Sequence, residues 1–140
     1  MPFDSPQDPQ WESLLEAAWA AHANAHVPYS RFRVGAALRW ESGVIAGCNV
    51  ENASYPVCVC AERNAIGAAV AAGLKPGGLQ ALVVVTEADI LTPPCGACRQ
   101  VIAEFASRLP ILLANRQARR LHRIEDLLPW PFHPDNLGSR

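Results

Sequence analysis

The sequence is short of charged residues and has no long apolar run. Asp, Glu, Lys and Arg make up 18% of its 140 residues, whereas about 25% is usual in a soluble chain. The formal net charge is -1, so the basic balance of most nucleic-acid-binding proteins is missing. The longest stretch without a charge, Ala17 to Ser30, is shorter than the roughly 20 residues of a transmembrane helix. We therefore expect a protein that binds neither nucleic acid nor a membrane.

An export signal, internal repeats and a Gly-rich phosphate-binding loop are also missing. The chain begins Met1-Pro2-Phe3-Asp4, without the basic start and apolar stretch of a secretory signal, so we expect a cytoplasmic protein. Half of the residues are hydrophobic, which excludes a disordered chain. The length predicts a single domain over residues 1–140, with a core at about 11–137 and loose ends.

Apolar residues recur at helical spacing in three segments and at strand spacing or in continuous runs in five others. The helices are expected from Pro9, capped by Asp8, to about Pro28, from Cys60 to Ala72 and from Cys95 to Ala106. The strands are expected at about 32–39, 44–50, 79–85, 111–114 and 121–124. This order predicts an α/β fold with three layers (α/β/α), in which helices cover both faces of a mixed five-stranded sheet.

The cysteines carry the clearest chemical signal. Clustered cysteines in a reducing compartment more often bind metal or do chemistry than form disulfides. Cys60, Cys95 and Cys98 fall at expected helix N-termini, where the helix dipole and free backbone N–H groups favour the thiolate. Three thiolates suit Zn²⁺ and leave its fourth position open to a water molecule. Glu62 follows a ligand by two residues and is a candidate to move that water's protons.

Other interpretations of these residues carry less weight. Adding Cys58 would give a closed four-thiolate zinc site. If residues 58–60 are extended, Cys58 and Cys60 share a face and both could reach the metal, whereas a helix that starts at residue 59 or 60 rotates Cys58 away. The closed site also leaves Glu62 without a role. A redox role for Cys95-x-x-Cys98 lacks the aromatic strand-to-helix setting of thioredoxin-like sites. Cys48 is expected to be a small buried hydrophobe.

Two further clusters have weak signals. His22 and His26 stand four residues apart on the first expected helix, but Ala23 replaces the glutamate of a metalloprotease motif. A run of arginines is able to touch phosphate or RNA, although most such runs are solvated faces. These arginines are Arg116, Arg119, Arg120 and Arg123.

Four motifs, in order, resemble the small zinc-dependent cytidine deaminase family. That superfamily allows a cysteine-only ligand set and has a glutamate that is not a ligand. Leu127-Leu128-Pro129 with Phe132 resembles the family's C-terminal segment. The four motifs are Tyr29-Ser30-x-Phe32-x-Val34-Gly35-Ala36-Ala37, Asn49-Val50-Glu51-Asn52-Ala53-Ser54-Tyr55, Cys60-Ala61-Glu62-Arg63 and Pro94-Cys95-Gly96-Ala97-Cys98-Arg99-Gln100.

The resemblance implies hydrolytic deamination of cytidine and deoxycytidine to uridine and deoxyuridine, a reaction of pyrimidine salvage. Cys60, Cys95 and Cys98 would hold one zinc ion per chain, and Glu62 would pass protons to ring N3 and then to the departing amine. The remaining implied site residues bind substrate or surround the metal ligands. Asn49 and Glu51 would bind the sugar hydroxyls, Phe32 and Ala61 would lie beside the base, and Arg63 and Gln100 would donate to the thiolates.

The resemblance also implies a homotetramer whose active sites are completed by neighbouring subunits. The low charge fraction and the aromatic side chains of Trp130 and Phe132 agree with an exterior that is covered by other chains. Phe132 would reach the substrate pocket of another chain, and Tyr55 would lie near that contact.

Two positions depart from the family pattern. Cys58 stands where the family usually has glycine, and Pro93 where it usually has serine. The sequence leaves open the preference between ribose and deoxyribose, and a modified cytosine or a cytosine-containing antibiotic as substrate. A non-catalytic zinc module that holds RNA is an alternative of another class, and Glu62 argues against it.

Overall fold

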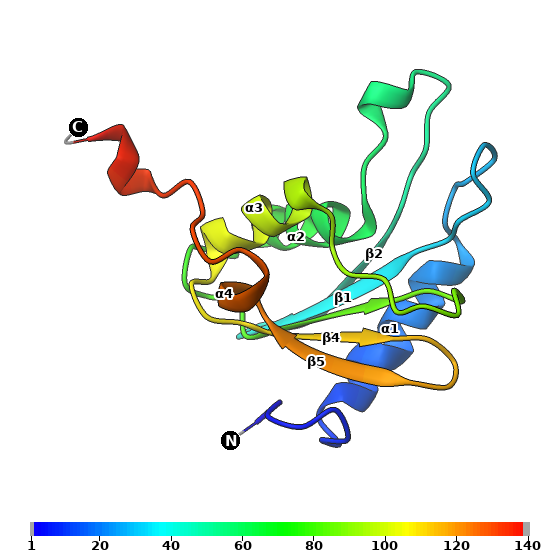
Figure 1. The fold of residues 1–140 in the computed structure, drawn as a ribbon, viewed down its shortest axis with the longest axis horizontal. Coiled ribbons are helices and arrows are strands. Elements are labelled where there is room, and N and C mark those ends of the chain that lie inside the picture. The colour runs from blue at the N-terminus through cyan, green and yellow to red at the C-terminus, as the bar shows by residue number, and fades with distance from the viewer. Residues whose placement is uncertain (1, 139–140) are drawn as a thin grey trace.

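A mixed five-stranded sheet lies between two helical layers in the computed structural model, which describes residues 2–138 (Figure 1). The strand order is β2-β1-β3-β4-β5, and only β3 and β4 run parallel. The expected three-layer fold is thus confirmed. The strands are β1 (Gly35–Trp40), β2 (Gly43–Cys48), β3 (Ala81–Val85), β4 (Pro110–Ala114) and β5 (Arg119–Arg123).

Alternate residues of the central strands feed two separate apolar clusters. Leu82 and Val84 point to the face that is covered by α2 (Ala61–Ala71) and α3 (Gly96–Phe105). Val83 and Val85 point to the opposite face, where they pack with α1 (Trp11–Ala23). Since side chains of a strand alternate between faces, this continuous apolar run serves both layers at once.

Two glycines allow the helices to lie close to the sheet. A Cβ atom on Gly35 would collide with the backbone oxygen of Ala18 in α1. A Cβ atom on Gly47 would come within 2.6 Å of the backbone nitrogen of Ala65 in α2. Missing side chains in β1 and β2 therefore set the spacing of both helical layers.

Two loops project from the same end of the sheet (Figure 1). The first covers residues 24–34. The second covers residues 49–60 and includes a short 3-10 helix, Tyr55–Val57. Val50 pairs with both His26 and Val59, so backbone hydrogen bonds tie the two loops together.

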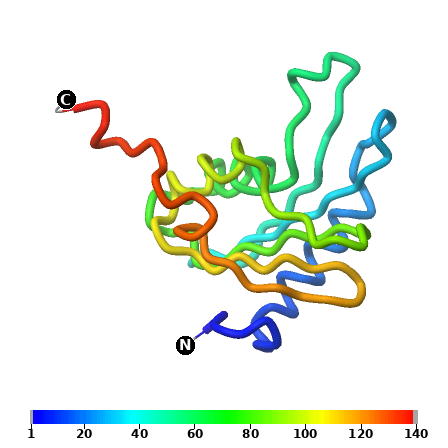
Figure 2. Tube along the Cα trace, in the orientation of Figure 1, coloured from blue at the N-terminus to red at the C-terminus, as the bar shows by residue number. Residues whose placement is uncertain are grey.

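The C-terminal segment leaves the body of the protein. After α4 (Ile124–Leu127) the chain runs outward and ends in the short 3-10 helix Pro134–Leu137 (Figure 2). Ser139 and Arg140, which belong to the expected loose tail, lie outside the described residues. No helix within residues 2–138 has the length and apolar character that crossing a bilayer requires.

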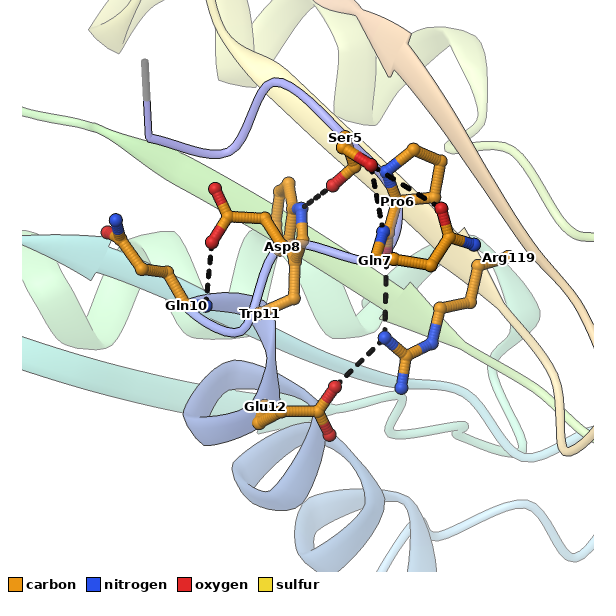
Figure 3. A network of polar contacts seen from close by, with 8 residues as sticks. All are labelled: Ser5, Pro6, Gln7, Asp8, Gln10, Trp11, Glu12 and Arg119. Atoms are coloured by element: carbon orange, nitrogen blue, oxygen red, sulfur yellow. Dashed lines mark hydrogen bonds and ion pairs between the residues drawn. The ribbon is translucent and has the colours of Figure 1, made fainter.

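The N-terminal segment differs from the expected loose end. The Phe3 side chain is buried and packs edge-on against Trp11, whose Nε1 donates to the Ser5 carbonyl at 3.0 Å. Arg119 of β5 donates to the Pro6 carbonyl and forms an ion pair with Glu12 at 2.9 Å (Figure 3). Residues 2–10 are therefore anchored to both α1 and the edge of the sheet.

Several element boundaries differ from the sequence prediction. The first helix starts at Trp11 rather than Pro9, because Asp8 accepts hydrogen bonds from the Phe3 and Gln10 backbone and closes a turn there. It ends at Ala23, so His26 is not helical. The last strand starts two residues early, at Arg119, and Ile124 already belongs to α4.

The first strand also begins late, at Gly35 rather than residue 32. The Asn49 side chain takes the place of a strand partner there. It accepts from the Val34 backbone N–H at 2.9 Å and donates to the Phe32 carbonyl at 2.8 Å. A side-chain amide thus holds this segment in a loop. The alternation of apolar and polar residues, which predicted a strand from residue 32, does not reveal this contact.

Candidate metal centre and active site

Three cysteine sulfurs meet where two helices begin. Cys60 and Cys95 are the N-cap residues of α2 and α3, both with extended backbone, and Cys98 lies in the first turn of α3. Their Sγ atoms all lie within 4.8 Å of one another. Because α2 and α3 pack together on one face of the sheet, residues far apart in the sequence form one cluster.

The cluster fits a zinc ion. In a tetrahedral site with Zn–S bonds of about 2.3 Å, two sulfurs lie roughly 3.8 Å apart. The Cys60 and Cys95 sulfurs are 3.8 Å apart. Cys58 is not part of the cluster among the described residues, since its sulfur faces the backbone of Asn52 instead. The arrangement agrees with an open three-thiolate site and not with a closed four-thiolate one.

Charge within the cluster concentrates on one sulfur. Hydrogen bonds from Cys98, Arg63 and Cys95 lower the pKa of the Cys60 thiol to about 5. The same hydrogen bond to Cys60, together with burial, raises the pKa of Cys98. A thiolate at Cys60 therefore exists at neutral pH, beside the Arg63 guanidinium, and the cluster is prepared to receive a cation.

Glu62 places a buried carboxyl beside these sulfurs. The residue is 4% exposed and lies in the first turn of α2, two positions after Cys60. Burial raises the pKa of its carboxyl, and the negative charge of Cys60 adds to the rise. A buried carboxyl with a raised pKa is the kind of group that enzymes use for general acid–base catalysis.

The expected sugar-binding residues, Asn49 and Glu51, lie in the second projecting loop and contact the first. Glu51 accepts hydrogen bonds from the backbone N–H groups of Tyr29 and Ser30, at 3.0 and 3.1 Å, both through Oε1. Hydrogen bonds from Ser30 and Tyr29 lower the pKa of the Glu51 carboxyl. A cavity of about 270 Å³ opens here between Glu51, Tyr55 and Cys58. The Glu51 side chain thus lines a cavity, and its hydrogen bonds favour the carboxylate form.

Backbone pairing connects the loop that lines this cavity to the residue before Cys60. Val59, which precedes Cys60, pairs with Val50, which lies between Asn49 and Glu51. Phe32 is 44% exposed in the neighbouring loop, and Ala61 is fully buried as the first residue of α2. The structure therefore gathers the residues of the first three sequence motifs at one end of the sheet.

Gln100 has other partners than those expected. Its side chain donates from Nε2 to the Phe132 carbonyl at 2.8 Å and accepts from the Phe132 N–H at 3.1 Å, instead of bonding a thiolate. The contact with Phe132 lies across 32 sequence positions, so no local pattern indicates it. The Phe132 ring itself is 60% exposed.

Arg99 is a connecting residue that the sequence alone did not single out. Its Nε donates to the Pro94 carbonyl at 2.8 Å and an Nη atom donates to the Leu127 carbonyl at 2.9 Å. The available sequence signal was its place in the fourth motif, directly after Cys98. Arg63, by contrast, donates to the Cys60 sulfur at 3.6 Å, as the resemblance implies.

The two weaker clusters have structural partners. His22 is buried and packs edge-on against Trp19, with ring centroids 5.0 Å apart. Arg116 stacks over Trp19 at 3.6 Å and pairs with Glu87. Arg119 pairs with Glu12 and Arg123 with Glu125. Three of the four arginines are therefore engaged within the chain, which does not favour an RNA-binding face.

Comparisons with known proteins agree with this geometry. The family model described as "Cytidine and deoxycytidylate deaminase zinc-binding region" matches residues 9–113. The cytidine deaminase of Sporosarcina psychrophila is 43% identical over 130 residues, which cover 91% of this chain and 94% of that protein. The cytidine deaminase of Mycobacterium tuberculosis strain H37Rv is 43% identical over 131 residues, covering 93% and 95%.

Solved structures give the same picture. The crystal structure of cytidine deaminase from Burkholderia pseudomallei matches with a TM-score of 0.82 and 50% identity, covering 86% of this chain and 97% of that one. The structure of cytidine deaminase from Mycobacterium leprae matches with a TM-score of 0.73 and 40% identity, covering 88% and 100%. The likeness extends over almost the full length of both relatives.

Proposed function

This chain belongs to the cytidine and deoxycytidylate deaminase family, and we propose that it hydrolyses cytidine and deoxycytidine to uridine and deoxyuridine, with release of ammonia. The observation that carries this proposal is the buried carboxyl of Glu62 beside the cluster of three thiols. We place the reaction in the cytoplasm, on free nucleosides of pyrimidine salvage.

Cys60, Cys95 and Cys98 would hold one zinc ion per chain and leave its fourth position open. When bound, zinc lowers the pKa of a water molecule to about 7 and so supplies a nucleophile at neutral pH. Three thiolates carry more negative charge than the ion is able to neutralise. The Arg63 guanidinium, 3.6 Å from the Cys60 sulfur, offsets part of that excess.

Glu62 moves the protons of the reaction. It takes one proton from the water that adds to C4 of the cytosine ring and gives it to N3. It then takes the proton of the new C4 hydroxyl and gives it to the amine, so that the C4–N4 bond breaks and ammonia leaves. Its burial and raised pKa support this role, because the same group must both accept and donate near neutral pH.

The loop residues would hold the nucleoside. Glu51 uses Oε1 for the backbone of its neighbouring loop, which leaves Oε2 for a sugar hydroxyl. Asn49 fixes the loop that carries Phe32 and would share the sugar contact. Phe32 and Ala61 would then lie beside the base. A site that forms hydrogen bonds with hydroxyl groups selects strongly for substrates that have them.

Assembly would complete the site. Trp130 is 91% exposed, Phe132 60% and Tyr55 66%, which is unusual for large aromatic side chains on a small domain. We propose a homotetramer in which Phe132 enters the substrate pocket of a neighbouring chain, near that chain's Tyr55. The projecting C-terminal segment supports this arrangement, since it extends away from its own body (Figure 1).

The reaction is tested directly with purified protein, cytidine and deoxycytidine. Conversion to the uracil nucleosides lowers the ultraviolet absorbance of the cytosine ring, and ammonia release is measured in parallel. We expect both signals with one zinc per chain, and neither after treatment with a chelator. Intact cytidine in the presence of fully loaded protein would refute the proposal, and a panel of modified cytosines then identifies the substrate.

A further inference from the structure

The C-terminal arm, defined here as residues 128–138, has few backbone hydrogen bonds to the backbone of the body, such as that from the Leu128 N–H to the Ile124 carbonyl. Pro129 and Pro131 flank Trp130 and have no N–H group to donate. Between residues 129 and 132 only Trp130 and Phe132 retain a backbone donor. The arm runs outward from the body (Figure 2). Its position therefore depends on contacts with the side chains around it.

Gln100 binds the arm through both the nitrogen and the oxygen of its side-chain amide. Nε2 donates to the Phe132 carbonyl at 2.8 Å, and Oε1 accepts from the Phe132 N–H at 3.1 Å. This is the pairing that a β-strand neighbour would give, supplied here by one side chain. It fixes both the place and the direction of the backbone at Phe132.

Beyond Leu128, which packs against the apolar core, packing does not replace these hydrogen bonds. A cavity of about 380 Å³ separates the arm from the C-terminal half of α3. It lies between Ala103 and Ser107 of the body and Pro129, Pro131 and His133 of the arm. A segment that stands off the helix in this way depends on its few specific contacts, and the Gln100 pair is the one that reaches Phe132.

Arg99 secures the beginning of the arm. It bonds the carbonyl of Pro94, which precedes Cys95, and the carbonyl of Leu127, which ends α4. Arg99 and Gln100 follow Cys98 directly. The helix turn that would hold the metal is thus joined to two points of the C-terminal chain, at Leu127 and at Phe132.

We propose that Gln100 is a positioning residue that fixes the C-terminal arm at Phe132, with Arg99 as its second anchor. The consequence for catalysis rests on the proposed function, in which Phe132 completes a substrate pocket. Gln100 then acts on nucleoside binding through Phe132 and not on the metal. Its loss raises KM more than it lowers kcat and leaves zinc in place.

The test variant is Gln100→Met, which preserves length and helix propensity but has no amide. Hydrogen–deuterium exchange with mass spectrometry, on zinc-loaded protein, measures peptides that cover residues 126–138. Loss of two hydrogen bonds predicts roughly tenfold faster exchange in the arm. KM for cytidine rises by a similar factor, and zinc remains at one per chain. The matched control is Gln117→Met, an exposed glutamine in the β4–β5 turn, which we expect to match the wild type.

A second variant covers the case in which Gln100→Met fails to fold. Gln100→Glu retains the acceptor for the Phe132 N–H but places an oxygen against the Phe132 carbonyl, so the arm again exchanges faster. Unchanged exchange of the arm in the folded variants would overturn the inference, and so would loss of zinc, which would assign Gln100 to the thiols. If the wild type does not deaminate cytidine, the proposed function fails, whereas the exchange rates still decide whether Gln100 holds the arm.

Discussion

Arg63 lies one helical turn after Cys60, and its guanidinium donates a hydrogen bond to the Cys60 sulfur at 3.6 Å. Residues three apart share a helix face, so the helix itself directs this cation to the thiolate. The contact adds to the hydrogen bond from Cys98 in lowering the pKa of the Cys60 thiol, and it gives Arg63 an electrostatic role in the site.

Replacing Arg63 by Gln should weaken the site without emptying it. Gln is shorter than Arg and neutral, so both the hydrogen bond from the Nη atom and the compensating charge are lost. Changes to residues that support metal ligands typically cost 10–100-fold in metal affinity or activity, and we expect about tenfold in kcat/KM. Arg108→Gln, at an exposed position, is the control. Equal activity of both variants would remove Arg63 from the mechanism.

Glu62→Gln should retain zinc and lose most activity. The substitution conserves shape but removes the group that accepts and donates protons. General acid–base help is worth roughly 10²–10⁴-fold, and a fall in kcat of that size is expected. Zinc content by atomic emission and initial rates with cytidine measure the two effects separately. Near-normal turnover would contradict the proton-transfer role.

The two neighbouring cysteines should behave differently. Cys58→Ala is expected to retain zinc and activity, because its sulfur contacts the Asn52 backbone outside the cluster. Cys60→Ala removes one of three sulfurs and should lose the metal. Zinc release followed with a colorimetric chelator compares them. Release from Cys58→Ala as well would make the four-thiolate site the better interpretation.

Truncation after Pro129 should impair substrate binding and assembly together. It removes two highly exposed aromatic side chains, Trp130 and Phe132, but no thiol. We expect a large rise in KM for cytidine and a smaller particle in light scattering at micromolar concentration, with zinc retained. A wild-type protein that is monomeric and fully active would contradict both the tetramer and the shared pocket.

His22 should make the protein less stable in mild acid. Burial lowers its pKa in the folded state, and the nearby charges of Arg116 and Arg33 add to this, while Glu87 opposes it. A lowered pKa means that the folded state favours the neutral imidazole. Its stabilising contribution is complete above the unfolded value of about 6.5 and is lost as the pH falls through the folded value.

Urea unfolding between about pH 7 and pH 5 measures this effect, since the unfolded histidine titrates near 6.5. The urea midpoint of the wild type should fall as the pH is lowered. In His22→Gln the midpoint should depend less steeply on pH, whatever the stability of the variant at pH 7. His26→Gln leaves His22 in place and should retain the wild-type slope. An unchanged slope in His22→Gln would show that other groups control the pH dependence.

Local patterns predicted the parts of the fold that depend on local chemistry. The helix starts at Cys60 and Cys95 follow from motif and spacing, and the run from Leu79 to Val85 contains a strand that is buried on both faces. These features arise from neighbours in the sequence, so periodicity and helix-capping rules reach them.

The missed features depend on contacts between distant residues. Asn49 holds the 32–34 segment out of the sheet across 15 and 17 positions. Arg119 anchors the N-terminal segment across 113 positions, and Gln100 meets Phe132 instead of a thiolate. Each is a side chain bonded to a distant backbone group, and no spacing rule reports such a partner.

Gly47 lets the start of α2, which carries part of the metal centre, lie directly on the sheet. Because β2 presents a bare backbone there, α2 rests directly on the strand at Ala61 and Ala65. A methyl group at residue 47 would push the start of that helix away from the sheet, and Cys60 and Glu62 would move with it. The affinity for a metal ion thus depends partly on the contact between α2 and the sheet. A substitution at Gly47, which is not a metal ligand, would be enough to lower that affinity.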